Sequence, residues 1–166
     1  MIPAEEFLRA LFGDDAPGSI ALFALPGSES HFFPASDFAA VSREARDLAG
    51  SANVYFALAP RDRARIPEGK RGDASTALGI GALWAEIDAR GGAHAAEEWK
   101  LPTLDEILEE LRELPLAPSI LVLSGGGIHA YWLLREFWTF GTDADRADAD
   151  ALARGWQGFL RRRWIE

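Results

Sequence analysis

The sequence contains no cysteine. This absence excludes disulfide bonds and thiolate-ligated metal sites, and it is typical of proteins from a reducing compartment. No apolar run approaches the roughly 20 residues that a membrane-spanning helix needs. The acidic N-terminal stretch, MIPAEEFLRALFGDDAPG, lacks the basic beginning of a secretory signal. We therefore expect a cytoplasmic protein that does not associate with a membrane.

Positive charge is also scarce, since 17 Lys and Arg residues face 26 Asp and Glu residues and leave a net charge of −9. Broad, non-specific adhesion to nucleic acid needs many cations to neutralise phosphates, so this balance argues against it. A local basic groove stays compatible with an acidic protein. The segment RDRARIPEGKRGD (61–73) holds five of the cations, and we expect it to form a mobile, solvated loop.

Hydrophobic spacing and turn residues predict helices and strands that alternate along the chain. We expect helices over 3–12, 37–48, 103–114 and 142–160, and strands over 19–25, 53–60, 82–90, 118–124 and 128–134. Thr103 and Glu106 fit a capping box at the start of the third helix, and GGAHAAEEWKLPT (91–103) is expected to be a connection. The chain shows no repeat or long linker. We therefore expect one domain over 1–166, of α+β or mixed α/β class, with most aromatic side chains, Trp84 and Trp132 among them, in its core.

Two carboxylates stand two residues apart in the expected strand ALWAEIDAR, at Glu86 and Asp88. Residues i and i+2 of a strand share a face, about 6.5–7 Å apart between Cα atoms. Such a pair repels itself unless a cation lies between its members, and hard oxygen ligands suit Mg²⁺ or Mn²⁺. Paired divalent ions are the apparatus of nucleotidyl transfer. The alternative is that both acids merely face solvent.

A second candidate site is SGGGIHAYW (124–132), which follows the apolar run PSILVL. If the two flanking segments form a hairpin, His129 and Tyr131 share one face of it. Three consecutive glycines cost much backbone entropy for a simple turn. We therefore expect a ligand to approach this backbone closely, with an anion held by Gly125, Gly126 and Gly127 together with Ser124 and His129. The alternative is a glycine-rich hairpin with a half-buried histidine.

Other motifs fit this stretch less well. It lacks the GK[ST] of a Walker A loop and the G-x-S-x-G of a nucleophile elbow, and no H-E-x-x-H occurs in the chain. Gly125-x-Gly127-x-x-Ala130 matches the dinucleotide fingerprint G-x-G-x-x-A. That fingerprint must open a helix, whereas IHAYWLL favours a strand. A dinucleotide-binding enzyme is therefore the lowest-ranked alternative.

Taken together, the E-x-D strand and the S-G-G-G-x-H-x-Y-W stretch some 35 residues later resemble the archaeo-eukaryotic primase superfamily. The resemblance is strongest to the primase-polymerase domains of phage, plasmid and other mobile-element proteins, and it extends over roughly residues 19 to 160. AEID resembles the family's metal-binding motif I, and LSGGGIHAYW resembles motif II, whose Ser and His contact the triphosphate of the incoming nucleotide. NVYFALAPR also resembles a strand of these domains.

This resemblance implies an RRM-like sheet, antiparallel or mixed and flanked by helices, with an additional N-terminal α/β unit. It implies a DNA primase or polymerase that uses Mg²⁺ or Mn²⁺, nucleoside triphosphates and a single-stranded DNA template or primer, with a helicase domain as a further partner in the full-length protein. Glu86 and Asp88 become the metal ligands, and His129 joins them as a catalytic residue. The implied nucleotide-binding residues are Ser124, Gly125, Gly126, Gly127 and His129, with basic side chains such as Arg61, Arg63, Lys70 and Arg71 as further candidates.

The chain departs from the family pattern at motif III, where a third carboxylate is expected on a later strand. GWQGFLRRRWIE ends the sequence where that strand would begin. The acids nearest to that point are expected on a solvated helix face: Asp143, Asp145, Asp148 and Asp150. We therefore expect a domain that is incomplete at its C-terminus. A truncated or degenerate module that binds nucleotide or nucleic acid without catalysis is the alternative function.

Overall fold

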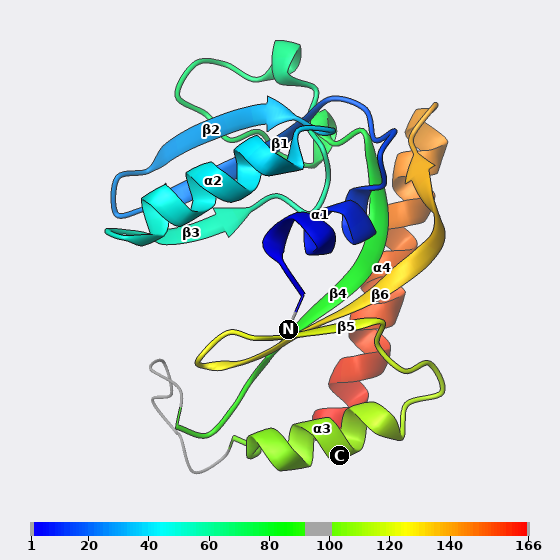
Figure 1. The fold of residues 1–166 in the computed structure, drawn as a ribbon. Coiled ribbons are helices and arrows are strands. Elements are labelled where there is room, and N and C mark those ends of the chain that lie inside the picture. Colours follow the sequence, from blue (N-terminus) through cyan, green and yellow to red (C-terminus); the bar gives the residue numbers. More distant parts are fainter. Residues whose placement is uncertain (1, 92–100, 166) are drawn as a thin grey trace. The chain divides into compact units, whose positions relative to one another are not determined.

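The computed structural model describes residues 2–91 and 101–165, so most of the connection expected at 91–103 lies outside the described residues. The described chain is of the α+β class, with four α-helices and two three-stranded sheets (Figure 1). It divides into two compact units. The first unit comprises the residues up to Gly81 together with Leu134–Asp150, and the second comprises Ala82–Leu133 together with the residues from Ala151 onward.

The sheet of the first unit has the order β2-β1-β3, with β1 at Ser19–Leu25, β2 at Glu29–Pro34 and β3 at Asn53–Phe56. Both neighbours run antiparallel to β1. Helix α1 spans Ala4–Phe12, and α2 spans Phe38–Ala49 and lies across the sheet (Figure 1). The Asp37 carboxylate accepts a hydrogen bond from Ala40 N at 3.0 Å and so caps α2. The predicted helices and the strand at 19–25 are confirmed.

Strand β2 was not among the predicted elements. Its sequence, ESHFFP, mixes charged, polar and aromatic residues and ends in proline, so it carries little strand signal of its own. Its formation depends on pairing with the strongly apolar β1, where Phe33 lies opposite Ile20 and Phe32 opposite Ala21. Cross-strand side-chain pairs of this kind stabilise a sheet independently of local propensity.

The segment 61–73 forms no strand or α-helix, as predicted, but it is more structured than a solvated loop. Two short 3₁₀-helices lie in and just after it, η1 at Arg63–Arg65 and η2 at Ala74–Thr76. The Asp62 carboxylate caps η1, and the Asp73 carboxylate caps η2. The strand predicted over 53–60 ends earlier, at Phe56.

The second sheet has the order β4-β6-β5, with β4 at Gly79–Asp88, β5 at Ile120–Leu123 and β6 at Gly127–Thr139. Strands β5 and β6 form the predicted antiparallel hairpin, in which Val122 lies opposite His129. A hydrogen bond from Ala89 N to Gly126 O, 2.9 Å long, sets the register of β4 against the beginning of β6. A second bond, from Phe140 N to Leu78 O, joins the opposite ends of the two strands and shows that they run antiparallel.

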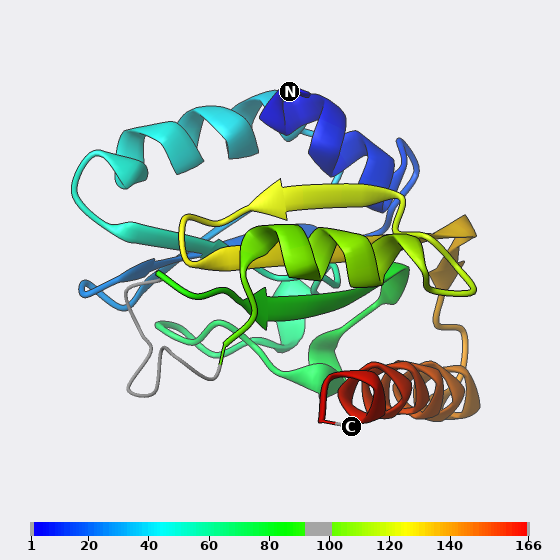
Figure 2. The same cartoon turned by 90° about the horizontal axis from the view of Figure 1, so that it is seen from below.

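Helix α3, at Leu104–Arg112, begins with the predicted capping box, in which the Thr103 hydroxyl and the Glu106 carboxylate each accept a backbone N–H. Helix α3 covers one face of the second sheet (Figure 2). Helix α4, at Asp143–Ile165, adds Leu160 to the same core. No helix among the described residues has the length and hydrophobicity of a membrane span.

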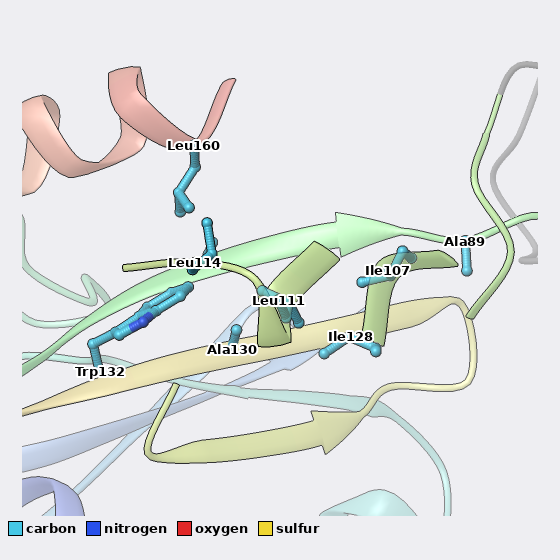
Figure 3. Packing of buried hydrophobic residues seen from close by; sticks show 9 residues of the cluster. Ala89, Ile107, Leu111, Leu114, Ile128, Ala130, Trp132 and Leu160 are labelled. Atoms are coloured by element: carbon cyan, nitrogen blue, oxygen red, sulfur yellow. The ribbon is translucent and has the colours of Figure 1, made fainter. Parts of the chain in front are cut away.

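Figure 3 shows the core of the second unit, which gathers apolar side chains from the sheet and from both helices. Strands β4 and β6 contribute Ala85, Ile128, Ala130 and Trp132, and Ala89 follows directly after β4. Full burial of an Ile or Leu side chain stabilises a fold by about 1.5–3 kcal/mol. Because side chains alternate along a strand, a core built from these positions leaves the intervening residues of β4 and β6 on the opposite face.

Candidate functional site

The opposite face of β4 and β6 carries the two carboxylates and the histidine singled out in the sequence. Glu86 and Asp88 of β4 alternate with the core residues Ala85 and Ala89, and His129 lies between Ile128 and Ala130 of β6. The His129 Nε2 atom lies 3.4 Å from Glu86 Oε1. Residues 43 positions apart in the sequence therefore meet, as expected from the two motifs.

These groups differ in their access to solvent. The Glu86 side chain is 56 % exposed and the His129 side chain 30 % exposed, and Asp88 is exposed as well. A polar side-chain pair at this exposure contributes little to stability, usually below ~1 kcal/mol. The arrangement therefore leaves the carboxylates reachable by a ligand, with the imidazole held beside them.

The three glycines have partly structural explanations. A Cβ at Gly127 would collide with the carbonyl oxygen of Ile87 and would lie 3.0 Å from the Asp88 Cα. Gly125 has a φ of +87° and nothing within 4 Å of a built Cβ, and Ser124 N donates to Gly127 O at 3.0 Å to close the hairpin. A positive φ at the first loop position is what a tight hairpin with glycine there requires. At Gly127 the close approach expected of a ligand is thus made by strand β4, and the anion site at Ser124, Gly125 and Gly126 stays a prediction.

The alternative interpretation of this stretch as a dinucleotide-binding fingerprint is wrong. Gly127 begins strand β6, which continues to Thr139, whereas the fingerprint needs a helix at this point so that its N-terminus faces the pyrophosphate. The β-branched and aromatic residues that follow the glycines favour the strand, and pairing with both β4 and β5 secures it.

Tyr131 is a neighbour of the site. The alternation along the strand predicted it on the same face as His129, but no role at the site was predicted for it. Its side chain is buried, at 3 % exposure. Burial, with a smaller contribution from the nearby Glu86 carboxylate, raises the pKa of Tyr131 to about 12. The hydroxyl thus stays neutral and supplies a hydrogen-bonding group on the carboxylate-bearing face. The alternation from His129 to Tyr131 was the signal for it.

Arg61 and Arg63 belong to the first unit, where both have structural contacts. The Arg61 guanidinium donates to Asp73 O at 2.6 Å, and burial lowers its pKa although Asp73 opposes this effect. Arg63 donates to Ile66 O at 2.7 Å and lies over the Phe32 ring, 4.7 Å from its centroid. These contacts order the basic segment, and a role of either arginine at a nucleotide stays a prediction.

The acids expected on a solvated helix face occupy the start of α4. Asp143, Asp148 and Asp150 are exposed. The Asp145 carboxylate accepts hydrogen bonds from the Thr142 hydroxyl at 2.9 Å and from the backbone N–H groups of Thr142 and Gly141 at 2.8 and 3.0 Å. These bonds lower the pKa of Asp145. Asp145 thus pairs reciprocally with Thr142, whose hydroxyl accepts from Asp145 N at 3.2 Å, and it helps to cap α4, a role that was not predicted from the sequence.

The donor set of Glu86 and Asp88 fits a hard divalent cation in kind, because both side chains offer exposed carboxylate oxygens on one strand face. Within the part of the chain that the structure describes, no group of three or more His, Cys, Asp or Glu side chains is placed to hold a metal ion. A cation at Glu86 and Asp88 would therefore draw its remaining ligands from water or from a phosphate.

Comparison with protein-family models, with curated proteins and with solved structures finds no significant match to this chain.

Proposed function

We propose that this chain is a nucleotidyltransferase domain of the primase-polymerase type, which uses Mg²⁺ or Mn²⁺ and nucleoside triphosphates on a nucleic-acid template. The observation that carries the proposal is the approach of His129 Nε2 to Glu86 Oε1 at 3.4 Å. It brings the histidine of the glycine-rich motif onto the same sheet face as the E-x-D pair. The proximity of two motifs with separate chemical rationales supports the proposal that they act in one site.

Each side chain has a separate role in this proposal. Glu86 and Asp88 hold the cation, which stabilises the charge that develops on the reacting phosphate. His129, when protonated, donates from both ring nitrogens, so it can bind a phosphate oxygen while Glu86 orients its ring. Ser124 is exposed and directly follows β5, where the turn of the hairpin begins. Its hydroxyl would contact the same phosphates.

The test is incorporation of labelled deoxynucleotides on a primed single-stranded template with Mn²⁺ or Mg²⁺. We expect incorporation by the wild-type chain and a loss of at least about a hundredfold in Asp88→Asn, because a ligand of the catalytic ion stabilises the transition state by several kcal/mol. Glu109→Gln is the matched control, since it removes one exposed carboxylate from α3. Wild-type rates in Asp88→Asn would overturn the catalytic assignment.

A second candidate is a module of the same fold that binds nucleotide without catalysis. It is favoured by the small donor set, since Glu86 and Asp88 are the two carboxylates that β4 presents here and no larger metal-binding group occurs among the described residues. This alternative predicts metal-dependent binding of ATP, lost in His129→Ala, with no incorporation by the wild-type chain. Calorimetric titration with ATP and Mn²⁺, set beside the incorporation assay, distinguishes the two candidates.

A further inference from the structure

Trp84 lies outside the core in which the sequence analysis placed it. Its exposure is 38 %, whereas Trp132 of the neighbouring strand is buried at 6 %. Trp132 donates its indole N–H to Leu116 O at 2.9 Å and packs edge-on against Trp156, with ring centroids 5.0 Å apart. Trp84 lies two residues before Glu86, in the alternate set of β4 that faces away from this core. An exposed indole on a sheet face is a candidate binding surface.

The three exposed members of this set form a row along β4: Trp84, Glu86 and Asp88. Because a strand rises about 3.3 Å per residue, the Cα atoms of neighbours in the row are about 6.6 Å apart, and those of Trp84 and Asp88 about 13 Å apart. One end of the row is aromatic and the other is anionic. Its chemistry therefore matches a ligand that has a planar ring at one end and a cation-bound polyphosphate at the other.

The backbone of β4 is held in place at Trp84 from both edges. Strand β6 pairs with one edge of β4, and on the other side the Gln157 side-chain amide of α4 donates a hydrogen bond to the Trp84 carbonyl oxygen. A backbone held in this way needs no ordering of its own when a ligand binds to the ring. Stacking on an aromatic side chain accepts any base, because every base has a π-face.

We propose that Trp84 is the base-stacking residue of the nucleotide site, so that the indole binds the base while Glu86, Asp88 and His129 bind the cation and the phosphates. This inference rests on the proposed function and adds to it the residue that contacts the base. It assigns the two ends of the nucleotide to the two ends of the row. Binding of the base and binding of the phosphates should then be separable by substitution.

The experiment compares two probes, ATP and inorganic tripolyphosphate, each titrated with Mn²⁺ into the full chain by calorimetry. In Trp84→Ala we expect ATP to bind about tenfold more weakly, the scale of a lost base–aromatic stack, and tripolyphosphate to bind as in the wild type. Trp84→Phe, which keeps an aromatic ring, should recover part of the loss. Asp88→Asn should weaken both probes.

Leu123→Ala is the matched control, because it truncates another exposed apolar side chain of the same sheet, 68 % exposed. It should leave both affinities unchanged. Equal losses for ATP and tripolyphosphate in Trp84→Ala, or no loss for ATP, would overturn the assignment of Trp84 while leaving the proposed function in place. A wild-type chain that binds neither probe would overturn both.

Discussion

Gly127 and Asp88 lie side by side where strands β4 and β6 meet beneath the proposed site. The absence of a side chain at Gly127 lets its backbone approach the Ile87 carbonyl group and the Asp88 Cα atom. Tyr131 lies on the same face of β6 as His129, two residues further along the strand. It is buried near Glu86. At the scale of single residues, Gly127 and Tyr131 are therefore close neighbours of the proposed site.

Gly127→Ala should destabilise the chain by about 1–3 kcal/mol, the usual cost of forcing extra atoms into a closely packed place, because the new methyl group collides with the Ile87 carbonyl oxygen. Gly155→Ala is the control. It lies in α4 with nothing within 4 Å of a built Cβ, so alanine should stabilise the helix by up to about 1 kcal/mol. Urea unfolding measures both, and equal effects of the two substitutions would contradict the explanation of Gly127.

Titration of Tyr131 tests the environment of the carboxylate face. Its pKa is raised from 10.0 to about 12, so above pH 10 the unfolded chain loses a proton that the folded chain keeps. The free energy of unfolding should therefore fall between about pH 10 and 12. Tyr131→Phe should reduce this fall. The chain has two tyrosines, so Tyr131 is the tyrosine that remains in the Tyr55→Phe variant. Its ultraviolet absorbance should change with a midpoint near pH 12. A midpoint near pH 10 would contradict the buried position of Tyr131 beside a carboxylate.

At the scale of elements, helices α2 and α3 begin where a side chain that can cap them stands in the sequence, at Asp37 and Thr103. Thr103 and Glu106 form a reciprocal box at α3, in which Thr103 N donates to the Glu106 carboxylate at 2.7 Å. Strands depend more on their partners. The sequence of β2 has little strand propensity, and β2 forms because it pairs with β1. A helix satisfies its backbone within its own segment, whereas a strand needs a neighbour. Helix ends were accordingly easier to predict than strand β2.

Thr103→Ala should cost about 1 kcal/mol of stability, the typical value for a lost N-cap, because the Glu106 N–H loses its acceptor and Glu106 loses one of its donors. Thr103→Ser keeps the hydroxyl and should retain most of the stability. Thermal unfolding followed by far-ultraviolet circular dichroism measures the difference. If the alanine and serine variants unfold together, the capping box contributes nothing to α3.

At the scale of the whole molecule, the net charge of −9 repels phosphate groups at long range. Of the five cations of segment 61–73, Arg61, Arg63 and Arg65 donate to backbone carbonyl groups of the first unit. In the proposed function, a divalent cation at the carboxylate face would offset part of the negative charge and so allow short-range contacts with the phosphates.

The sequence by itself indicated an α+β or mixed α/β class, most of the elements, and a shared strand face for Glu86 with Asp88 and for His129 with Tyr131. These features follow from local periodicity, because alternation along a strand and caps at a helix end are properties of one segment. The same alternation associated Tyr131 with His129 before any packing was known.

Tertiary structure alone decided the pairing of β2, the need for glycine at Gly127 and the exposure of Trp84. Each depends on what a distant segment places beside the residue: β1 beside β2, the Ile87 carbonyl oxygen beside Gly127, and a core that takes Ala85 and Ala89 but leaves Trp84 on the other face. Tryptophan is apolar enough to predict burial in any sequence. Trp84 stays in contact with solvent because helices α3 and α4 pack against the opposite face of β4.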